Sequence, residues 1–539
     1  MQRIQNVKRT LAMILAMMMV LTSTAFANWD SFQGDNDNNG VTETGVTSAK
    51  PSVTTVNLPN NGAYTGVDCQ PLVHGSNIYV LYNGGTPDGS KGGARLACVD
   101  AAATKGETAW DVQVGAADNI SQVSTPVITG DGSTLYGLYT YSENYFEGFA
   151  KQTVPAGKSV EYTFKDVELP DGYTNLQVTT GIMGTGKESG TVTILSGKTE
   201  VAKFSGTSYE GYTFNIYYTD GAPIPEGTYD IKVEITNGSD KDETWSQCQM
   251  LANAWKLFKA DLTGKDHAVT DLNVSGTGSA NTPVTLAEGK LYFGTYGAGS
   301  AYFQYDTAAE KLTTFNAPGG DQYYWAGAVV HNDRVYFGGE KGIVYVCDVN
   351  NFSKQLGNMY ITGGVSIRSS LAKHGDHLYF TSTDGVLWRV KMEGNSVVEP
   401  ESIDLGDTDE VSYSTSTPTI AGDYVYVGTY GETDPETYAC AGAVLRVGLD
   451  QFGKDKDLAI TTIYKGDKVQ CSPVVYTRSS NVYVYFTTNV GNGTGYCYRD
   501  NSPRWDTSTS ASGYAIQGFA MGNGFCVFGN DNNQLTIVK

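Results

Sequence analysis

Four stretches of the chain share one pattern that decides the fold: NTPVTLAEGKLYFG at residues 281–294, WAGAVVHNDRVYFG at 325–338, RSSLAKHGDHLYFT at 368–381 and STPTIAGDYVYVG at 416–428. Each begins with small polar residues, continues through a short apolar run, turns at Gly, Asp or Asn, and returns through an aromatic-rich run. Two short runs rich in β-branched and aromatic residues on either side of such a turn are typical of a β-hairpin. The chain is therefore predicted to be built from repeated hairpins.

Further copies of the pattern begin near residues 69, 124, 471 and 516, which makes about eight. Equivalent positions recur at steps of mostly 43 to 55 residues, with one gap of 157. They are Pro71, Pro126, Pro283, Gly327, Ser370, Pro418, Pro473 and Gly518. A third and a more variable fourth run follow each hairpin, and four short strands per unit are typical of a propeller blade.

The repeats predict an all-β protein with an eight-bladed β-propeller, seven blades being the alternative. No segment after the leader keeps apolar residues at helical spacing for three turns. The last copy stops at a third strand, residues 535–538, so we expect residues 53–58 to supply its fourth strand. Such closure would remove the open sheet edge that invites aggregation.

The gap of 157 residues indicates an insertion at residues 144–254, which divides the propeller into residues 28–143 and 255–539. The insertion alternates apolar and polar residues between Gly, Pro and Asp turns, the pattern of an antiparallel β-sandwich with one buried face. Its outline resembles jelly-roll modules that bind sugars or decorate extracellular proteins. The aromatic residues that could stack on a sugar ring, or else fill the core, are Tyr209, Tyr212, Tyr217, Tyr218 and Trp245.

Residues 1–27 read as a secretory signal peptide, with a basic start, an apolar run and Ala25-Phe26-Ala27 at its end. Removing its three basic residues changes the formal charge of the chain from −21 to −24. Such a charge repels nucleic-acid phosphates and anionic lipid heads, and no later stretch is apolar enough to span a bilayer. We expect a secreted or cell-surface protein whose partner is an extracellular protein or a glycan.

The opening WDSFQGDNDNNGVT at residues 29–42, the repeated S-x-P-V pattern and LACVDAAATKGETAW at residues 96–110 together resemble the pyrroloquinoline-quinone-type β-propellers. The best single match is Ala97, Asp100, Gly106 and Trp110, which is similar to the motif that joins neighbouring blades in that family. The resemblance implies either a quinoprotein dehydrogenase or one of its cofactor-free relatives.

The dehydrogenases of this family carry two adjacent cysteines against the quinone, together with acidic and amide ligands for a metal. None of the eight cysteines here is adjacent to another. This departure favours a protein without the quinone, and an enzyme stays the less favoured reading. We therefore predict a non-catalytic binding or scaffold module, with a quinoprotein-like oxidoreductase or a polysaccharide-active enzyme as the alternative.

Residues just before the first strand of each repeat should converge on the axial mouth of a propeller. An aromatic pair, one Arg and several amides there predict a polar cup for a ligand, although some residues must line any propeller channel. The predicted ligand-binding residues are Asp68, Gln70, Gln122, Tyr324, Trp325, Arg368, Tyr413, Gln470 and Gln517.

The acidic start of the chain partly matches a calcium loop. Asp35, Asp37, Asn39 and Gly40 fit its first half, but Val46 stands where the closing acid belongs. A turn stabilised by Asp and Asn side chains is the favoured interpretation. No residue is therefore predicted as a metal ligand, and calcium stays an open alternative.

Overall fold

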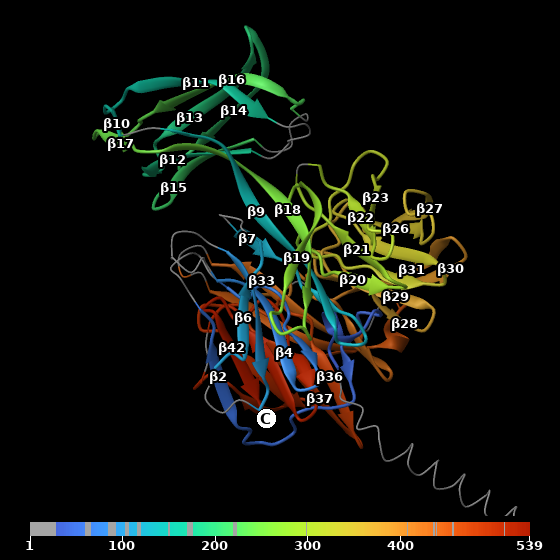
Figure 1. Ribbon diagram of the computed structural model, residues 1–539. Coiled ribbons are helices and arrows are strands. Elements are labelled where there is room, and N and C mark those ends of the chain that lie inside the picture. The colour runs from blue at the N-terminus through green and yellow to red at the C-terminus, as the bar shows by residue number, and fades with distance from the viewer. Residues whose placement is uncertain are drawn as a thin grey trace, which may run out of the picture.

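The computed structural model describes residues 28–59, 66–84, 93–102, 107–115, 120–148, 151–169, 176–218, 224–297, 299–406, 408–434, 437, 439–454, 458–510 and 513–539. The predicted signal peptide and Gly106 lie outside these residues. Within them the chain forms strands and two short 3₁₀ turns, η1 (Phe32–Gly34) and η2 (Leu449–Gln451), and no α-helix (Figure 1). The all-β prediction is confirmed. Among the described residues no helix has the length and apolar character needed to cross a membrane.

Most of the strands form antiparallel sheets of four strands that follow one another along the chain, which we number sheets 1 to 8. Sheet 1 has β3 (Leu72–His74), β4 (Asn77–Asn83), β5 (Ala94–Asp100) and β6 (Trp110–Gln113); sheet 2 has β8 (Val127–Ile128), β9 (Thr134–Gly148), β18 (Cys248–Asp261) and β19 (Val269–Thr277), with β7 (Ile120–Val123) beside β9; sheet 3 has β20 (Thr285–Ala287), β21 (Lys290–Gly294), β22 (Tyr302–Asp306) and β23 (Lys311–Phe315); sheet 4 has β24 (Val329–His331), β25 (Arg334–Gly338), β26 (Ile343–Asp348) and β27 (Gln355–Tyr360). Sheet 5 has β28 (Ala372–His374), β29 (His377–Thr381), β30 (Val386–Glu393) and β31 (Ser396–Asp404); sheet 6 has β32 (Thr419–Ala421), β33 (Tyr424–Thr433), β34 (Cys440–Gly448) and β35 (Ile460–Asp467); sheet 7 has β36 (Val474–Arg478), β37 (Asn481–Thr487), β38 (Gly495–Arg499) and β39 (Ser502–Asp506), with β1 (Val41–Thr42) parallel to β36; sheet 8 has β40 (Ala520–Gly522), β41 (Phe525–Gly529), β42 (Gln534–Val538) and β2 (Val53–Asn57).

The repeated residues of the sequence pattern stand one or two positions before the first strand of each sheet. In several repeats this segment contains a Ser or Thr whose side chain accepts a hydrogen bond from the equivalent segment of the preceding sheet. Ser370 Oγ accepts the backbone N–H of Gly327 at 2.9 Å, Thr417 Oγ1 accepts that of Ser370 at 3.0 Å, and Ser472 Oγ accepts that of Thr417 at 2.9 Å. Ser or Thr at this position therefore satisfies a buried N–H of the sheet before it.

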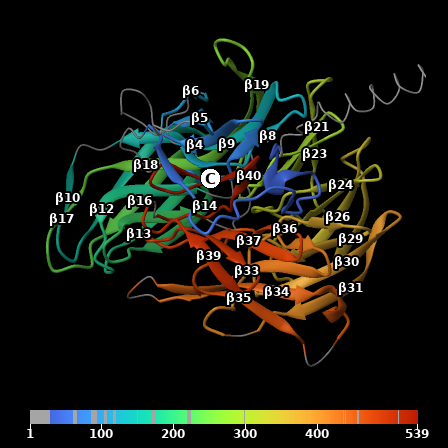
Figure 2. The same cartoon turned by 90° about the horizontal axis from the view of Figure 1, so that it is seen from below.

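The sheets pack side by side in chain order, and each interface has its own cluster of buried side chains. One cluster joins sheets 1 and 2, and others join 2 and 3, 3 and 4, 4 and 5, 5 and 6, and 6 and 7. Trp110, from the predicted joining motif, stacks on His267 of the β18–β19 turn with ring centroids 4.1 Å apart. Figure 2 shows sheets 3 to 7 following one another around the molecule.

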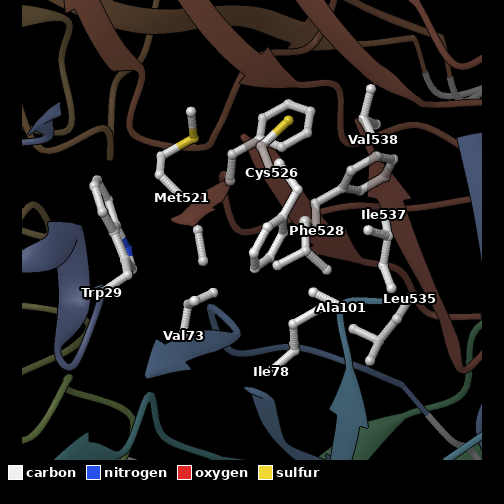
Figure 3. Close-up of a cluster of buried hydrophobic side chains, with 14 of the residues drawn as sticks. Trp29, Val73, Ile78, Ala101, Met521, Cys526, Phe528, Leu535, Ile537 and Val538 are labelled. Carbon is white, nitrogen blue, oxygen red and sulfur yellow. The ribbon is translucent and has the colours of Figure 1, made fainter. Parts of the chain in front are cut away.

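A single larger cluster joins sheets 7, 8 and 1, so the series closes into a propeller-like ring. Its members include Val73 and Ile78 of sheet 1 and Phe528 and Ile537 of sheet 8 (Figure 3). The predicted pairing of the two ends is confirmed, because β2 pairs antiparallel with β42 in the register Val53↔Val538 to Asn57↔Gln534.

Residues 29–46 follow the first strands of the sheets around the ring, in the order of the sheets. Asn38, which is 3% exposed, donates from Nδ2 to the carbonyls of Ala328, directly before sheet 4, and Leu371, directly before sheet 5, both at 3.0 Å. Other contacts of this segment, in order of sheet, are Trp29 with Val73, Asp30 with Ile128, Asn36 with Leu286, Asp37 with Lys373, Asn39 with Ile420, Gly40 with Val475, and Thr44 with Gly522. The N-terminal segment therefore touches every sheet of the ring.

Between β9 and β18 the chain forms β10 (Gln152–Val154), β11 (Ser159–Leu169), β12 (Leu176–Met183), β13 (Ser189–Ser196), β14 (Thr199–Thr207), β15 (Thr213–Tyr218), β16 (Gly227–Thr236) and β17 (Glu243–Trp245). These strands lie outside the ring in Figure 1 and have their own buried cluster, drawn from residues 154–252. β12 and β15 extend the sheet of β18 and β9, while β11, β16, β13 and β14 form a second sheet. Residues 144 and 254, the predicted boundaries, fall inside β9 and β18, whose pairing continues past both residues with one register shift at Tyr145.

Candidate functional site

The segments that lead into the eight first strands meet at one cavity of about 370 Å³ on the ring axis. Because these segments occupy equivalent places in each repeat, residues far apart in sequence come together there. All eight sheets contribute to its lining, and the N-terminal segment adds Phe32. The lining residues are Phe32, Asp68, Gln122, Val123, Thr125, Asn281, Pro283, Tyr324, Trp325, Arg368, Thr415, Thr417, Gln470, Ser472, Ile516 and Gln517.

Seven of the nine predicted ligand-binding residues line this axial cavity: Asp68, Gln122, Tyr324, Trp325, Arg368, Gln470 and Gln517. Tyr413 lines an adjoining cavity of about 430 Å³, whose wall also includes Tyr324, Trp325, Arg368 and Gln470. The polar lining residues that the sequence analysis missed are Thr125, Asn281, Thr415, Thr417 and Ser472. Their position in the repeat was the available signal, since each precedes a first strand by only a few residues.

Gln70 is not part of the cavity lining. Its side chain is 1% exposed, and its Oε1 accepts Trp29 Nε1–H at 3.1 Å and the backbone N–H of Gln33 at 2.8 Å. Its Nε2 donates to the carbonyl of Phe519 at 2.9 Å. Gln70 therefore fastens the N-terminal segment to sheets 1 and 8, and its contacts serve the fold.

Two aromatic side chains form one wall of the axial cavity. The rings of Tyr324 and Trp325 lie 4.4 Å apart at 49°, and Tyr296 packs edge-on against Tyr324 at 5.1 Å. Trp325 has φ +60°, a left-handed conformation that a bulky residue rarely adopts and that costs about 1–3 kcal/mol. Its carbonyl accepts the N–H of Gly327 at 3.1 Å and Ser370 Oγ–H at 3.3 Å, which hold the backbone in this conformation.

The one Arg of the lining is already paired. Arg368 donates from Nε to both oxygens of Glu340 at 3.0 and 3.1 Å and from Nη2 at 2.8 Å, and its guanidinium lies 4.9 Å from the ring centre of Tyr324. Burial and the nearby Asp531 raise the pKa of Asp68, the acid of the lining. The axial cavity therefore presents no unpaired cation among the described residues.

Amides and hydroxyls supply the other polar groups of the cavity. Gln470 Oε1 accepts Asn489 Nδ2–H at 2.8 Å, which fixes its carboxamide. Asn281 is 5% exposed, and neither its Nδ2 nor its Oδ1 has a partner among the described residues. A buried carboxamide without hydrogen bonds costs free energy, so Asn281 indicates a place for a polar group of a ligand or a water.

The lining does not fit a pyrroloquinoline quinone with its metal. The quinone carries three carboxylates, which need cationic partners, whereas Arg368 is held by Glu340. The eight cysteines are free and buried, and burial raises the pKa of the thiols of Cys69, Cys98 and Cys471. In the part of the chain that the structure describes, no three His, Cys, Asp or Glu side chains gather as metal ligands.

The partial calcium loop is occupied by protein contacts. Asp35 Oδ1 accepts the backbone N–H groups of Asp37 at 2.9 Å and Asn39 at 3.5 Å, which is the turn favoured by the sequence. Asp37 forms an ion pair with Lys373 at 2.9 Å, and Asn39 bonds both backbone groups of Ile420.

The five aromatic side chains singled out within residues 144–254 divide into an exposed group and a buried group. Tyr209, Tyr212 and Tyr217 are 76%, 58% and 52% exposed, whereas Tyr218 and Trp245 belong to the buried cluster. Of the two interpretations of the sequence, the core therefore holds for Tyr218 and Trp245, which strand alternation turns inward.

No protein-family model matches this chain, and no curated protein matches it. Among solved structures, it is similar to a europium-containing methanol dehydrogenase, with a TM-score of 0.44, 10% identity, and coverage of 93% of this chain and 89% of that chain. It is also similar to BamB from Moraxella catarrhalis, with a TM-score of 0.32, 9% identity, and coverage of 52% and 91%. The computationally designed Ika8 protein gives a TM-score of 0.36, 11% identity, and coverage of 52% and 80%. Because these TM-scores are all below 0.5, the fold is described from the sheets of this chain alone.

Proposed function

We propose that this chain is a secreted, non-catalytic binding protein: an eight-bladed β-propeller with a β-sandwich inserted at residues 144–254. Its axial cavity binds an uncharged, hydroxyl-rich ligand such as the end of a glycan. One observation carries the proposal. The cavity combines an aromatic pair with amides and hydroxyls, and the cation of its lining is paired with Glu340.

This lining suits a sugar ring. The faces of Tyr324 and Trp325 can cover the apolar C–H face of the ring, while Gln122, Gln470 and Gln517 offer both donors and acceptors to its hydroxyls. A phosphate or carboxylate ligand would lack a free cationic partner and would meet Asp68, on a chain of formal charge −21.

The same lining supports a binding role more than hydrolysis. Glycoside hydrolysis needs two carboxyl groups on either side of the scissile bond. Asp68 lines the axial cavity, but the acid near it, Asp531, is not part of that lining. Glu340 is engaged by Arg368.

The test is a panel of neutral and anionic glycans on an array, followed by calorimetry with each neutral glycan that binds. We expect binding of neutral glycans that Trp325→Ala weakens at least about tenfold, equivalent to ~1.4 kcal/mol. Tyr360→Ala serves as the control, because Tyr360 is 61% exposed and lies outside the lining. Thermal unfolding of both variants verifies that they fold.

The quinone is tested on the same protein. Titration with pyrroloquinoline quinone and calcium should give no sub-micromolar binding and no reduction of a dye with alcohols or sugars. Either signal, if lost in Arg368→Ala, would overturn the proposal in favour of an oxidoreductase. Release of reducing sugar from a bound glycan, if lost in Asp68→Asn, would overturn it in favour of a polysaccharide-active enzyme.

A further inference from the structure

A second cavity, of about 200 Å³, lies where the strands outside the ring meet sheets 2 and 3, and we call it the junction cavity. β9, β12, β15 and β18 form one side of it, and the segments after β19 and β21 form the other. Its lining residues are Ser142, Leu176, Gln177, Tyr217, Leu251, Ala252, Asn253, Gly278, Ser279, Tyr296 and Gly297. None of these residues is charged, although charged residues make up 17% of the chain.

The pairing of the strands places polar side chains of this junction cavity on one sheet face. Gln177 pairs with Tyr217 on one side and with Leu251 on the other, and Asn253 pairs with Ser142. Directly paired residues point to the same face of a sheet, and alternate residues point to the opposite face. The opposite face of these strands carries buried residues of the cluster drawn from residues 154–252.

Hydrogen bonds between β9, β18 and the segment after β19 fix several lining residues of the junction cavity. Asn253 donates from Nδ2 to Ser279 Oγ at 2.9 Å, and its Oδ1 accepts Ser142 Oγ–H at 3.2 Å. The backbone of Ser279 exchanges two bonds with that of Tyr296, at 2.7 and 2.8 Å. The polar groups are therefore positioned before any ligand arrives, which lowers the entropic cost of binding.

The junction cavity lies next to the axial cavity. Ser279 lines the first and Asn281 lines the second, and only Ala280 stands between them. Two residues of extended chain span about 7 Å at most. Tyr296, in the lining of the junction cavity, also packs edge-on against Tyr324 of the axial cavity at 5.1 Å. The two cavities are therefore neighbours in the structure.

From this geometry we infer that the two cavities are successive subsites for one extended, neutral glycan chain, an inference that rests on the proposed function. The axial cavity takes the end of the chain, and the junction cavity takes a unit farther along it, against Tyr217 and Gln177. The uncharged lining excludes the ion pairs that a charged peptide or an anionic polymer would need, and the aromatic and amide groups match those of the axial cavity.

The inference is tested by the dependence of affinity on ligand length. The probes are β-1,4-linked oligomers of glucose, mannose and xylose, from two to six units, titrated into the full mature chain. In the wild-type protein we expect the affinity for one series to rise at least about tenfold between the dimer and the hexamer. Tyr217→Ala and Gln177→Ala should each remove most of this gain and leave the affinity for the dimer within about twofold.

Tyr212→Ala is the matched control, because Tyr212 is 58% exposed in the same part of the chain but does not line the cavity. It should keep the full gain with length. If a dimer binds and the gain is missing, or persists in both Tyr217→Ala and Gln177→Ala, the second subsite is refuted and the axial site stands. If no neutral glycan binds the wild-type protein, either on the array or in this length series, both proposals are overturned.

Discussion

Replacement of Asn38 by alanine should destabilise the protein more than its single carboxamide suggests. Asn38 lies in the N-terminal segment and joins two sheets through hydrogen bonds of 3.0 Å each to Ala328 and Leu371. It also has φ +51°, a left-handed conformation that asparagine tolerates better than alanine. Asn38→Ala therefore removes both bonds and strains the backbone at once.

The expected loss follows from these contributions. Each neutral hydrogen bond contributes about 1 kcal/mol net. Alanine in the left-handed region costs a further ~1–2 kcal/mol. The free energy of unfolding should thus fall by about 3–4 kcal/mol. Asn36→Ala is the matched control, because Asn36 is exposed and donates one bond, to the Leu286 carbonyl at 2.6 Å. We expect it to cost about 1 kcal/mol at most.

The assay is urea unfolding of residues 28–539, followed by tryptophan fluorescence and by far-UV circular dichroism. The two probes must give coincident transitions before a single free energy is assigned to a chain of this size. A loss below about 1 kcal/mol for Asn38→Ala, or equal losses in the two variants, would show that the N-terminal segment does not hold sheets 4 and 5 together.

Three further predictions concern the acids, the aromatic contacts and the thiols. Burial and the neighbouring Glu188 raise the pKa of Glu243 to about 7, so its ionisation opposes folding and stability should fall as the pH rises from about 4.5 to 7. Glu243→Gln should therefore raise the free energy of unfolding at pH 8 and leave it nearly unchanged at pH 4.5, as measured by urea unfolding at both values. Because the side chain is only partly buried and solvent screens its charge, we expect a gain of about 1–2 kcal/mol, less than the full pKa shift implies. A double-mutant cycle of Trp110→Ala and His267→Ala should give a coupling of about 0.5–1.5 kcal/mol from their stacked rings, and a coupling near zero would remove this contact from the sheet 1–2 interface. The eight buried thiols should resist iodoacetamide in native protein at pH 8 and react together on unfolding, as counted by mass spectrometry; early labelling of any of them would contradict their burial.

Much of the ring could be predicted because the sheets pack in the same way and use similar residues at equivalent positions. A Ser or Thr before the first strand, an apolar first strand and an aromatic second strand recur in the sequence, so position in the repeat predicts position in space. This is why Gln122, Gln470 and Gln517 lie together at the axial cavity although they are nearly 400 residues apart at the extremes.

The exceptions arise where a contact depends on elements outside the repeat. Gln70 stands one residue before Pro71, as Ser472 stands one residue before Pro473. Ser472 lines the axial cavity, whereas the N-terminal segment covers Gln70 and uses its carboxamide. Tyr217 and Tyr218 are adjacent in one strand, and only its position in the sheet shows that the first faces solvent and the second the core. The predicted boundary at residue 144 lies within β9, a strand that contributes both to the ring and to the strands outside it.

The N-terminal segment links the closure of the ring to the candidate site. Within about 30 residues it supplies Phe32 to the lining of the axial cavity, bridges sheets 4 and 5 through Asn38, and continues into β2, the last strand of sheet 8. The entropy lost on closing a loop grows only slowly with its length, so pairing the two ends of a long chain is not strongly disfavoured. Loosening of this segment would therefore open the edge of β42 and remove one wall of the cavity together. Ring stability and ligand affinity should accordingly fall in parallel in variants of Asn38, whereas variants of Trp325 should lower affinity alone.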